Sequence, residues 1–253
     1  MSSKRSNPPA TAYDWARSVP ATSAMLTAML GFELPLRAID RFAGHEAFMD
    51  AGHVLADLLW RSFSLTGAKL DVRGREHLTP GERYLIVANH QGFSDVIVLS
   101  NVLREWQPRY VAKRSLARGW PSISYLLRHS GSAVIDRSQG GAAVAEIERL
   151  GHQAKREDWS VAIFPEGTRA KDGVPRSWKP GGIRALLETM GEVRVLPISL
   201  SGGAELFAHN ALPFTADVTM GCHIHAPVDA PARDEDLGSW LEGLRQTVAS
   251  VLV

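Results

Sequence analysis

The chain of 253 residues is 45% hydrophobic and 22% charged, with a formal net charge of +1. These values are ordinary for a globular protein and argue against a disordered chain or a repeat architecture, and the length suits one large α/β domain. The single cysteine, Cys222, leaves no intramolecular disulfide and no thiolate cluster for a metal. Such cysteine usage favours a reducing compartment, so we expect a cytoplasmic protein.

The beginning of the chain predicts a pair of helices ahead of the main domain. Residues 1–20 lack the compact apolar core of a secretory signal, and we expect a flexible segment there. We expect the two helices within residues 21–66. The first contains most of the apolar run between Arg17 and Glu33, which is too short and too interrupted to span a membrane. A stripe at helical spacing follows within residues 47–65. Such helices usually pack on the protein's own core, but they could also lie in a membrane interface without crossing it.

Beyond residue 66, strand-like and helix-like runs alternate, as in a sheet covered by helices. Strands are expected at 69–74, 83–89, 109–113, 132–137, 160–165, 193–200 and 217–225. Helices are expected at 93–103, 121–129, 141–155, 182–190 and 234–252. Several of these strands are continuously apolar, which indicates burial on both faces. The sequence therefore predicts an α/β fold over residues 67–253, with a mostly buried mixed sheet flanked by helices and preceded by the N-terminal helical pair.

The expected strand at 193–200 contains an internal proline, Pro197. Proline cannot donate a hydrogen bond to a neighbouring strand. This position therefore predicts an edge strand, a bulge, or a wall beside a substrate chain.

Positive charge is concentrated in the middle of the chain. Residues 104–137 carry seven basic and two acidic side chains, a net of +5, and residues 166–184 carry five basic and two acidic ones, a net of +3. Such a concentration of positive charge would attract an anionic ligand. The same charges would also occur if these residues simply lay on the solvent-exposed faces of surface helices.

The stretch VANHQGFSD, residues 87–95, ends an apolar strand with His90 and opens a helix with Asp95 in its first turn. The Asp95 carboxylate could hold one imidazole nitrogen of His90 and leave the other free to take a proton from a hydroxyl. The His-x4-Asp spacing also arises by chance, and an aspartate in a first turn can simply cap the helix. Because the sequence has no GxSxG motif and no Cys/His pair to supply a covalent nucleophile, a catalytic His90 would activate a hydroxyl of the substrate.

The stretch FPEGTR, residues 164–169, follows another apolar strand. Gly167 permits close approach of the backbone to a ligand, Thr168 adds a hydroxyl, and Arg169 offers a fork suited to phosphate oxygens. Glu166 would repel a phosphate, so we expect it to accept a hydrogen bond from a hydroxyl or to orient Arg169. A strand-to-loop turn with a surface arginine is the plainer interpretation.

A third strand end, GSAVIDR at residues 131–137, carries Asp136 and Arg137. Arg137 could contact a phosphate, or it could form an ion pair with Asp136. Both interpretations stay open on the sequence.

The ordered set NHQGFSD, GSAVIDR, FPEGTR and VLPISL resembles the four sequence blocks of the glycerolipid acyltransferase family, which includes bacterial acyltransferases of 1-acyl-sn-glycerol 3-phosphate. The likeness runs from about residue 69 to about residue 200, with order and spacing preserved. It implies transfer of a fatty acyl group from a thioester, on coenzyme A or acyl carrier protein, to the free hydroxyl of a lysophospholipid. It also implies no further cofactor, and a peripheral position at the inner face of the membrane.

The same resemblance assigns His90 as the general base and Asp95 as its orienting partner. The residues it assigns to the acceptor phosphate are Lys113, Arg137, Glu166, Gly167, Thr168 and Arg169. Two positions depart from the family pattern, because Gly92 and Ala170 stand where members often have serine. Both positions bear on hydrogen bonding in the acceptor site.

Three alternatives remain at this point. The acceptor could instead be glycerol 3-phosphate or a lyso-ornithine lipid, or the fold could serve as a non-catalytic lipid-binding module. His223 and His225, beside Cys222, share one face of a strand and could bind zinc. No third and fourth ligands match them by spacing, so we assign no metal site.

Overall fold

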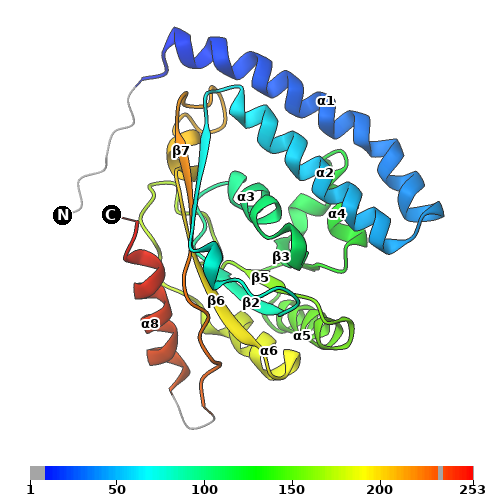
Figure 1. The fold of residues 1–253 in the computed structure, drawn as a ribbon, viewed down its shortest axis with the longest axis vertical. Helices are drawn as coiled ribbons and strands as arrows, with labels where there is room; N and C mark the ends of the chain where they lie inside the picture. The colour runs from blue at the N-terminus through cyan, green and yellow to red at the C-terminus, as the bar shows by residue number, and fades with distance from the viewer. Residues whose placement is uncertain (1–8, 233–235, 253) are drawn as a thin grey trace.

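The computed structural model describes residues 9–232 and 236–252 and places a seven-stranded sheet between layers of helices (Figure 1). The strand order is β1-β7-β6-β2-β5-β3-β4. Among the described strands, β6 pairs with β7 antiparallel and every other pair is parallel, so the sheet is mixed, as predicted. The strands are β1 Lys69–Arg73, β2 Tyr84–Ala88, β3 Arg109–Lys113, β4 Ala133–Ile135, β5 Val161–Ile163, β6 Arg194–Ser201 and β7 Thr219–Ile224.

The helices are α1 Ala12–Phe42, α2 His45–Ser64, α3 Ser94–Val102, α4 Ile123–His129, α5 Gly140–Glu157, α6 Pro180–Met190, α7 Gly203–Leu206 and α8 Leu237–Ala249. Short 3-10 turns are η1 Arg75–His77, η2 Arg104–Trp106 and η3 Arg114–Ala117. Each strand and helix expected after residue 66 is present, with ends that differ by a few residues, and residues 234 and 235 of the last expected helix lie outside the described part. The short helix α7 was not predicted.

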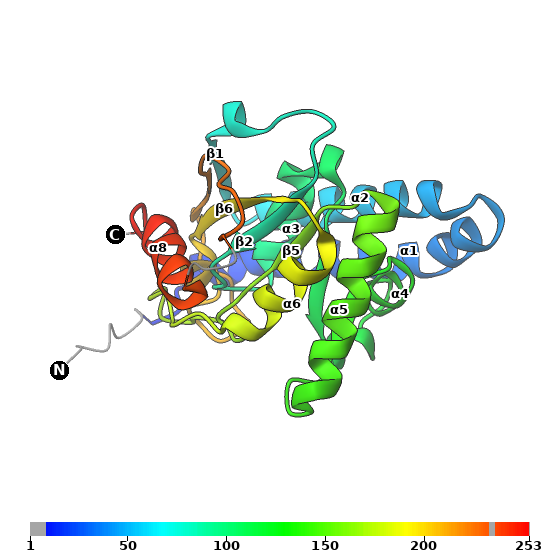
Figure 2. The ribbon, with the colours of Figure 1, turned by 90° about the horizontal axis from the view of Figure 1, so that it is seen from below.

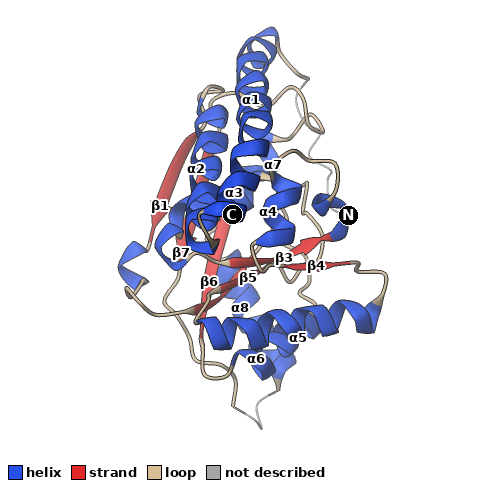
Figure 3. Cartoon of the chain, turned by 90° about the vertical axis from the view of Figure 1, so that its right-hand side faces the viewer, coloured by secondary structure: helices blue, strands red, loops and turns tan. Residues whose placement is uncertain are grey.

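The two faces of the sheet pack into separate cores, because side chains alternate along each strand. On β2, Tyr84 and Ile86 face a core that α1, α2 and α3 cover, whereas Leu85 and Val87 face a core that α5, α6 and α8 cover. Figure 2 shows α5 and α6 on the near side of the strands, and Figure 3 shows them on the side opposite to α2, α3 and α4. A strand buried on both faces must be continuously apolar, which is the pattern that the sequence displays.

Helix α1 begins earlier than we expected. The Thr11 hydroxyl accepts the Asp14 N–H at 3.1 Å, and the Asp14 carboxylate accepts the Thr11 N–H at 2.9 Å. This capping box starts the helix at Ala12, so the prediction of a flexible segment is wrong for residues 12–20, and residues 1–8 lie outside the described part. The helix continues through Pro20 and is long and apolar enough to cross a membrane by length and composition alone, contrary to our reading of the apolar run.

The N-terminal helices share a core with the sheet. Met29 of α1 and Leu59 of α2 belong to the same buried cluster as Ile86 and Leu196. The boundary that we placed at residue 67 therefore separates the N-terminal helices from the α/β part of the chain, but both parts share one hydrophobic core.

Pro197 lies inside the sheet, so an edge strand is the wrong interpretation of it. β6 pairs with β2 on one side and with β7 on the other. The β6 register matches Ile198 with Ile224 but Val195 with Val228, so two residues of β6 face three of the returning chain. Pro197 accepts the His225 N–H at 3.0 Å at this bulge. Its missing N–H falls where the ladder is already irregular, which makes proline tolerable in an inner strand.

Candidate active site

Four neighbouring parallel strands, β2, β5, β3 and β4, end at the same edge of the sheet. His90 follows β2, residues 166–169 follow β5, Lys113 ends β3, and Arg137 follows β4. All of these except Glu166 line one cavity. Residues far apart in the sequence therefore meet where open α/β sheets usually bind their ligands.

His90 and Asp95 form a hydrogen-bonded pair, with 2.8 Å between Nδ1 of His90 and Oδ2 of Asp95. The same carboxylate oxygen accepts the N–H groups of Gln91 at 2.6 Å and Gly92 at 2.9 Å. An ionised carboxylate can only accept hydrogen bonds, so this geometry assigns the proton of the neutral imidazole to Nδ1. The Nε2 atom is then free to accept a proton. Asp95 thus ties the turn before α3 to the first turn of that helix and also fixes the orientation of the His90 ring.

The FPEGTR loop holds His90 from the side of β5. Phe164 stacks on the imidazole, with ring centroids 4.3 Å apart. Oε1 of Glu166 accepts the His90 backbone N–H at 3.1 Å, and the Ala170 N–H donates to the His90 carbonyl oxygen at 2.7 Å. The ring and both backbone polar groups of His90 are therefore fixed by residues of one loop.

Glu166 lies behind His90 and is only 2% exposed. Burial raises the pKa of its carboxyl to about 7, and the hydrogen bond from the His90 N–H opposes this rise. Among the described residues, Glu166 has no hydrogen bond or ion pair with Arg169, and its other polar neighbour is Arg176, whose backbone N–H and charge also oppose the rise of the pKa. The expectation that Glu166 orients Arg169 is therefore wrong, because its carboxylate turns toward the backbone that follows β2.

Lys113, Arg137 and Arg169 line the cavity beside His90. Arg137 donates a hydrogen bond to the carbonyl oxygen of Gly167, whose φ of 67° is a conformation that favours glycine. Burial lowers the pKa of Arg137, and the positive charge of Arg169 lowers it further. None of these three cations has an ion pair within the described part of the chain. Cations that approach one another without a carboxylate between them favour an anionic ligand.

The ion pair considered for Arg137 is not formed. Asp136 instead accepts the N–H of Ser138 at 3.1 Å and its hydroxyl at 2.6 Å. These bonds turn the carboxylate back on its own loop, so Arg137 faces the cavity with its charge uncompensated by Asp136.

The cavity has a volume of about 710 Å³ and extends from His90 into the space between α2, α3, β3 and α4. Apolar side chains form most of its walls, among them Leu55, Leu59, Val96, Ile97, Ile123 and Leu126. Its cations lie at the end where the strands finish. A charged mouth and an apolar interior suit a ligand that has an anionic end and a hydrocarbon chain.

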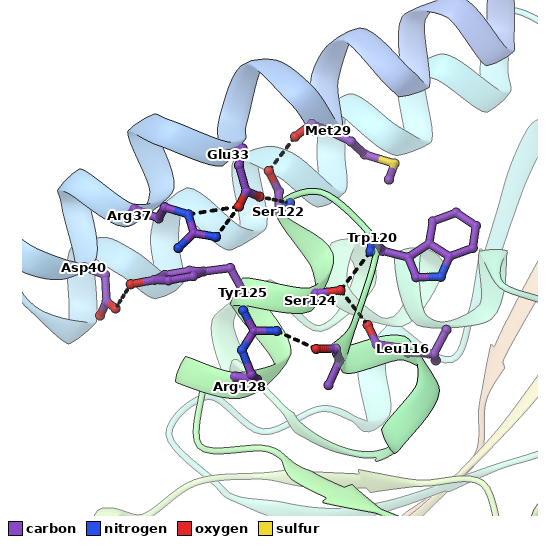
Figure 4. A network of polar contacts seen from close by, with 11 residues as sticks. Met29, Glu33, Arg37, Asp40, Leu116, Trp120, Ser122, Ser124, Tyr125 and Arg128 are labelled. Atoms are coloured by element: carbon purple, nitrogen blue, oxygen red, sulfur yellow. Dashed lines mark hydrogen bonds and ion pairs between the residues drawn. The ribbon is translucent and has the colours of Figure 1, made fainter.

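Helix α1 holds the outer wall of the cavity in place (Figure 4). The hydroxyl of Ser122 donates to the Met29 carbonyl oxygen at 2.6 Å, and the N–H of Ser122 donates to the carboxylate of Glu33. The Tyr125 hydroxyl donates to Asp40 at 2.7 Å. Ser122 therefore ties the segment between η3 and α4, which carries the wall residue Trp120, to α1, and Tyr125 ties α4 itself to the same helix.

Comparison with known proteins now identifies the chain. A family model described as Acyltransferase matches residues 69–201, which is more than half of the sequence. The chain belongs to the acyltransferase family. It is therefore an enzyme of the acyltransferase class, and the matched region contains every site residue named from the sequence.

Similar proteins carry more specific names. The chain is 25% identical over 199 residues to "1-acyl-sn-glycerol-3-phosphate acyltransferase alpha" of Mus musculus, covering 78% of this chain and 68% of that protein. It is 30% identical over 171 residues to "1-acyl-sn-glycerol-3-phosphate acyltransferase" of Borreliella burgdorferi, covering 66% of this chain and 65% of that protein. About a third of each relative thus lies outside the match.

A solved structure has a similar fold. It is the crystal structure of the 1-acyl-sn-glycerophosphate (LPA) acyltransferase, PlsC, from Thermotoga maritima. The TM-score is 0.70 at 20% sequence identity, and the match covers 94% of this chain and 95% of that one. At this identity, the similarity shows that the two chains share the fold, including the N-terminal helices.

Several residues that shape the site were not predicted from sequence. Phe164 and Asn89 lie within the motifs, but neither of them was assigned a role from the sequence. The Asn89 side chain donates to the Leu200 carbonyl oxygen at 2.8 Å and accepts the Leu200 N–H at 2.7 Å, which joins the end of β2 to β6. The unusual Gly92 also has a packing reason, because a Cβ there would lie 3.0 Å from the Phe207 ring.

The zinc alternative finds no further support. No group of three His, Cys, Asp or Glu side chains suited to a metal occurs in the residues that the structure describes. Cys222 is buried in the core, whereas His223 and His225 lie together on the other face of β7, with ring centroids 4.6 Å apart.

Proposed function

We propose that this enzyme transfers a fatty acyl group from an acyl thioester to the free hydroxyl of 1-acyl-sn-glycerol 3-phosphate, giving phosphatidate. The observation that carries the proposal is the position of the His90–Asp95 pair, at the boundary between three unpaired cations and an apolar cavity. The names of the similar proteins from Mus musculus and Borreliella burgdorferi support the same acceptor.

His90 acts as the general base in this reaction. Its Nε2 atom takes the proton of the acceptor hydroxyl while that oxygen attacks the thioester carbonyl, and the thiol of the carrier leaves. The imidazole becomes positively charged in this step. Because Oδ2 of Asp95 lies 2.8 Å from Nδ1, its carboxylate stabilises that charge.

The cations recognise the phosphate of the acceptor. Arg137 and Arg169 line the same cavity as His90 and lie close enough for their charges to interact, and Lys113 adds a third charge. An acceptor without a phosphate, such as a lyso-ornithine lipid, would leave these charges uncompensated in a partly buried site. The arrangement therefore favours a phosphate-bearing acceptor.

The apolar cavity receives the acyl chain of the donor. Its walls come from α2, α3, β3 and α4, and they lead away from His90, so a chain held there would keep its thioester carbonyl at the mouth. Coenzyme A and acyl carrier protein both carry a thioester on the same phosphopantetheine arm, and the cavity as such suits either donor.

The function is tested by a steady-state assay with palmitoyl-CoA and 1-acyl-sn-glycerol 3-phosphate. His90→Ala should lower kcat by about 10²- to 10⁴-fold, the contribution typical of a positioned general base. The matched control is His152→Ala, since His152 is exposed on α5. Transfer by His90→Ala at the rate of the unchanged protein would contradict the mechanism.

The acceptor site is tested separately with Arg169→Ala. Loss of one charge-assisted hydrogen bond should raise KM for the lysophosphatidate by about tenfold or more while kcat changes less. Arg156→Ala, an exposed site on α5, serves as the control. An unchanged KM for the acceptor would contradict the phosphate role.

We also propose that α1 docks the enzyme on the membrane surface that holds its substrate. The outward side of α1 presents large apolar residues at helical spacing, namely Trp15, Val19, Leu26, Leu30 and Leu34. The helix is also tied to the rest of the molecule along its length, from Asp14 with the Ala216 N–H to Asp40 with Tyr125. A helix held flat in this way suits an interfacial position better than a crossing one.

Co-sedimentation with vesicles of phosphatidylglycerol and phosphatidylethanolamine tests this docking. Leu30→Glu combined with Leu34→Glu should weaken binding by about a hundredfold, because two exposed leucines no longer enter the acyl boundary. The control is Val174→Glu, since Val174 is as exposed as Leu30 but lies in a loop after β5. Undiminished binding of the double variant would exclude α1 as the docking surface.

A further inference from the structure

A histidine inside the apolar cavity is not used by the proposed chemistry. His53 lies on α2, lines the cavity and is only 6% exposed. Neither of its ring nitrogens has a close hydrogen-bond partner among the described residues. Burial lowers its pKa, so the ring is neutral near pH 7 and carries one donor and one acceptor. A buried imidazole without a close partner calls for a ligand or a water that completes it.

Two hydroxyl groups lie in the same part of the cavity. Ser100 of α3 and Tyr110 of β3 both line it, and their hydroxyl oxygens are 2.9 Å apart. One hydroxyl hydrogen makes that bond, which leaves the second available to a ligand. The Ser100 backbone also makes a weak hydrogen bond with the His53 ring, which acts against the fall of its pKa. The three side chains therefore form one group, called here the polar cluster.

The polar cluster lies deep in the cavity, away from the reacting atoms. Tyr110 precedes Lys113 by three residues on β3, which is about 10 Å along a strand. Ser100 is six residues beyond the first residue of α3, which is about 9 Å along a helix. Both elements start or end at the edge that carries His90. With carbon–carbon bonds of about 1.5 Å in a zigzag, this depth corresponds to roughly the eighth carbon of an extended acyl chain.

We propose that the polar cluster binds a hydroxyl group in the middle of the acyl chain, so that the enzyme prefers hydroxylated fatty acyl donors. The proposal rests on the proposed function, since it assigns a substrate class to the acyl cavity. A hydroxyl both donates and accepts, so it can donate to the unprotonated nitrogen of His53 and accept the free hydroxyl hydrogen of the Ser100–Tyr110 pair. A plain hydrocarbon chain would leave that nitrogen and that hydroxyl hydrogen unpaired.

The test compares donors that differ by one oxygen atom. The donors are palmitoyl-CoA, the CoA thioester of palmitate hydroxylated near its eighth carbon, and 3-hydroxypalmitoyl-CoA. The unchanged enzyme should use the mid-chain hydroxylated donor with a kcat/KM about ten- to hundredfold above that of palmitoyl-CoA. The 3-hydroxy donor should gain no such advantage, because its oxygen stays near the mouth. Equal kcat/KM for palmitoyl-CoA and the mid-chain donor would overturn the proposal and indicate that only water completes His53.

Substitutions test whether the polar cluster causes the preference for the mid-chain hydroxylated donor over palmitoyl-CoA. His53→Leu and Tyr110→Phe should each bring the ratio of the two kcat/KM values down toward one. His152→Leu, on the exposed side of α5, should keep the ratio of the unchanged enzyme. A ratio that survives His53→Leu in a variant with an unchanged Tm would also overturn the proposal.

Failure of the proposed function gives a different result. If no donor transfers its acyl group to the lysophosphatidate, the proposed function is refuted. Equilibrium binding of the plain and mid-chain donors to His90→Ala then tests the cluster without turnover. Tighter binding of the hydroxylated donor, by about tenfold or more, supports the cluster, and equal binding refutes it.

Discussion

Asp95→Asn separates the two tasks of the carboxylate that holds His90. In the structure, Oδ2 of Asp95 accepts three hydrogens, from His90 Nδ1, Gln91 N and Gly92 N. The amide oxygen of an asparagine can occupy the same place and accept all three, and the two backbone donors favour this orientation over the reverse. The substitution should therefore preserve the imidazole tautomer and ring position while removing the negative charge.

The expected loss follows from the charge alone. Two opposite charges about 4 Å apart interact by roughly 4 kcal/mol at an effective dielectric constant of about 20. Without the carboxylate charge, the imidazolium that forms in the transition state loses up to this amount of electrostatic stabilisation. The loss corresponds to a fall in kcat of about 10²- to 10³-fold. Asp95→Ala should cost more, because it also frees the ring and leaves buried N–H groups without an acceptor.

The assay is a steady-state comparison of the two variants with palmitoyl-CoA and the lysophosphatidate, together with thermal unfolding. Asp95→Asn should lower kcat with little change in either KM, and its Tm should fall less than that of Asp95→Ala. Two outcomes would refute the reasoning. One is a kcat for Asp95→Asn equal to that of the unchanged enzyme, and the other is a kcat as low as that of Asp95→Ala.

Two further predictions concern stability. Burial raises the pKa of Glu166 to about 7 in the folded protein, above the value of about 4.5 in the unfolded chain. Because the folded protein then holds this proton more tightly, the free energy of unfolding of the protein should fall as pH rises from about 4.5 through 7, by up to about 1.4 kcal/mol per pH unit. Glu166→Gln should remove this fall. The difference in unfolding free energy between the variant and the unchanged protein, measured by urea unfolding, should therefore grow from pH 5 to 7 and then level off. A difference that stays constant with pH would contradict the raised pKa. Asn89→Ala leaves the N–H and carbonyl of Leu200 without partners and should lower the unfolding free energy by about 2–4 kcal/mol, and a loss below 1 kcal/mol would show that the link between β2 and β6 matters little.

The sequence predicted the parts of the fold that depend on neighbouring residues. β2 is apolar at every position because both of its faces are buried, so the strand could be predicted from its sequence pattern. His90 and Asp95 could be paired in advance for a similar reason, since only one tight turn separates them. The start of α1 was misjudged, because a capping box at Thr11 and a helix that runs on through Pro20 outweigh the interruptions in the apolar run.

The sequence by itself determined the strands, the helices after residue 66 other than α7, and the local His90–Asp95 pair, because short-range patterns of burial and hydrogen bonding encode them. Only the tertiary structure decided what surrounds that pair. The strand order brings Lys113, Arg137 and Arg169 to one edge, and it turns Glu166 onto the His90 backbone. It also places His53, from a helix that the sequence reads as plain packing, inside the cavity. These contacts join residues far apart along the chain, and no local pattern records which strands will lie side by side.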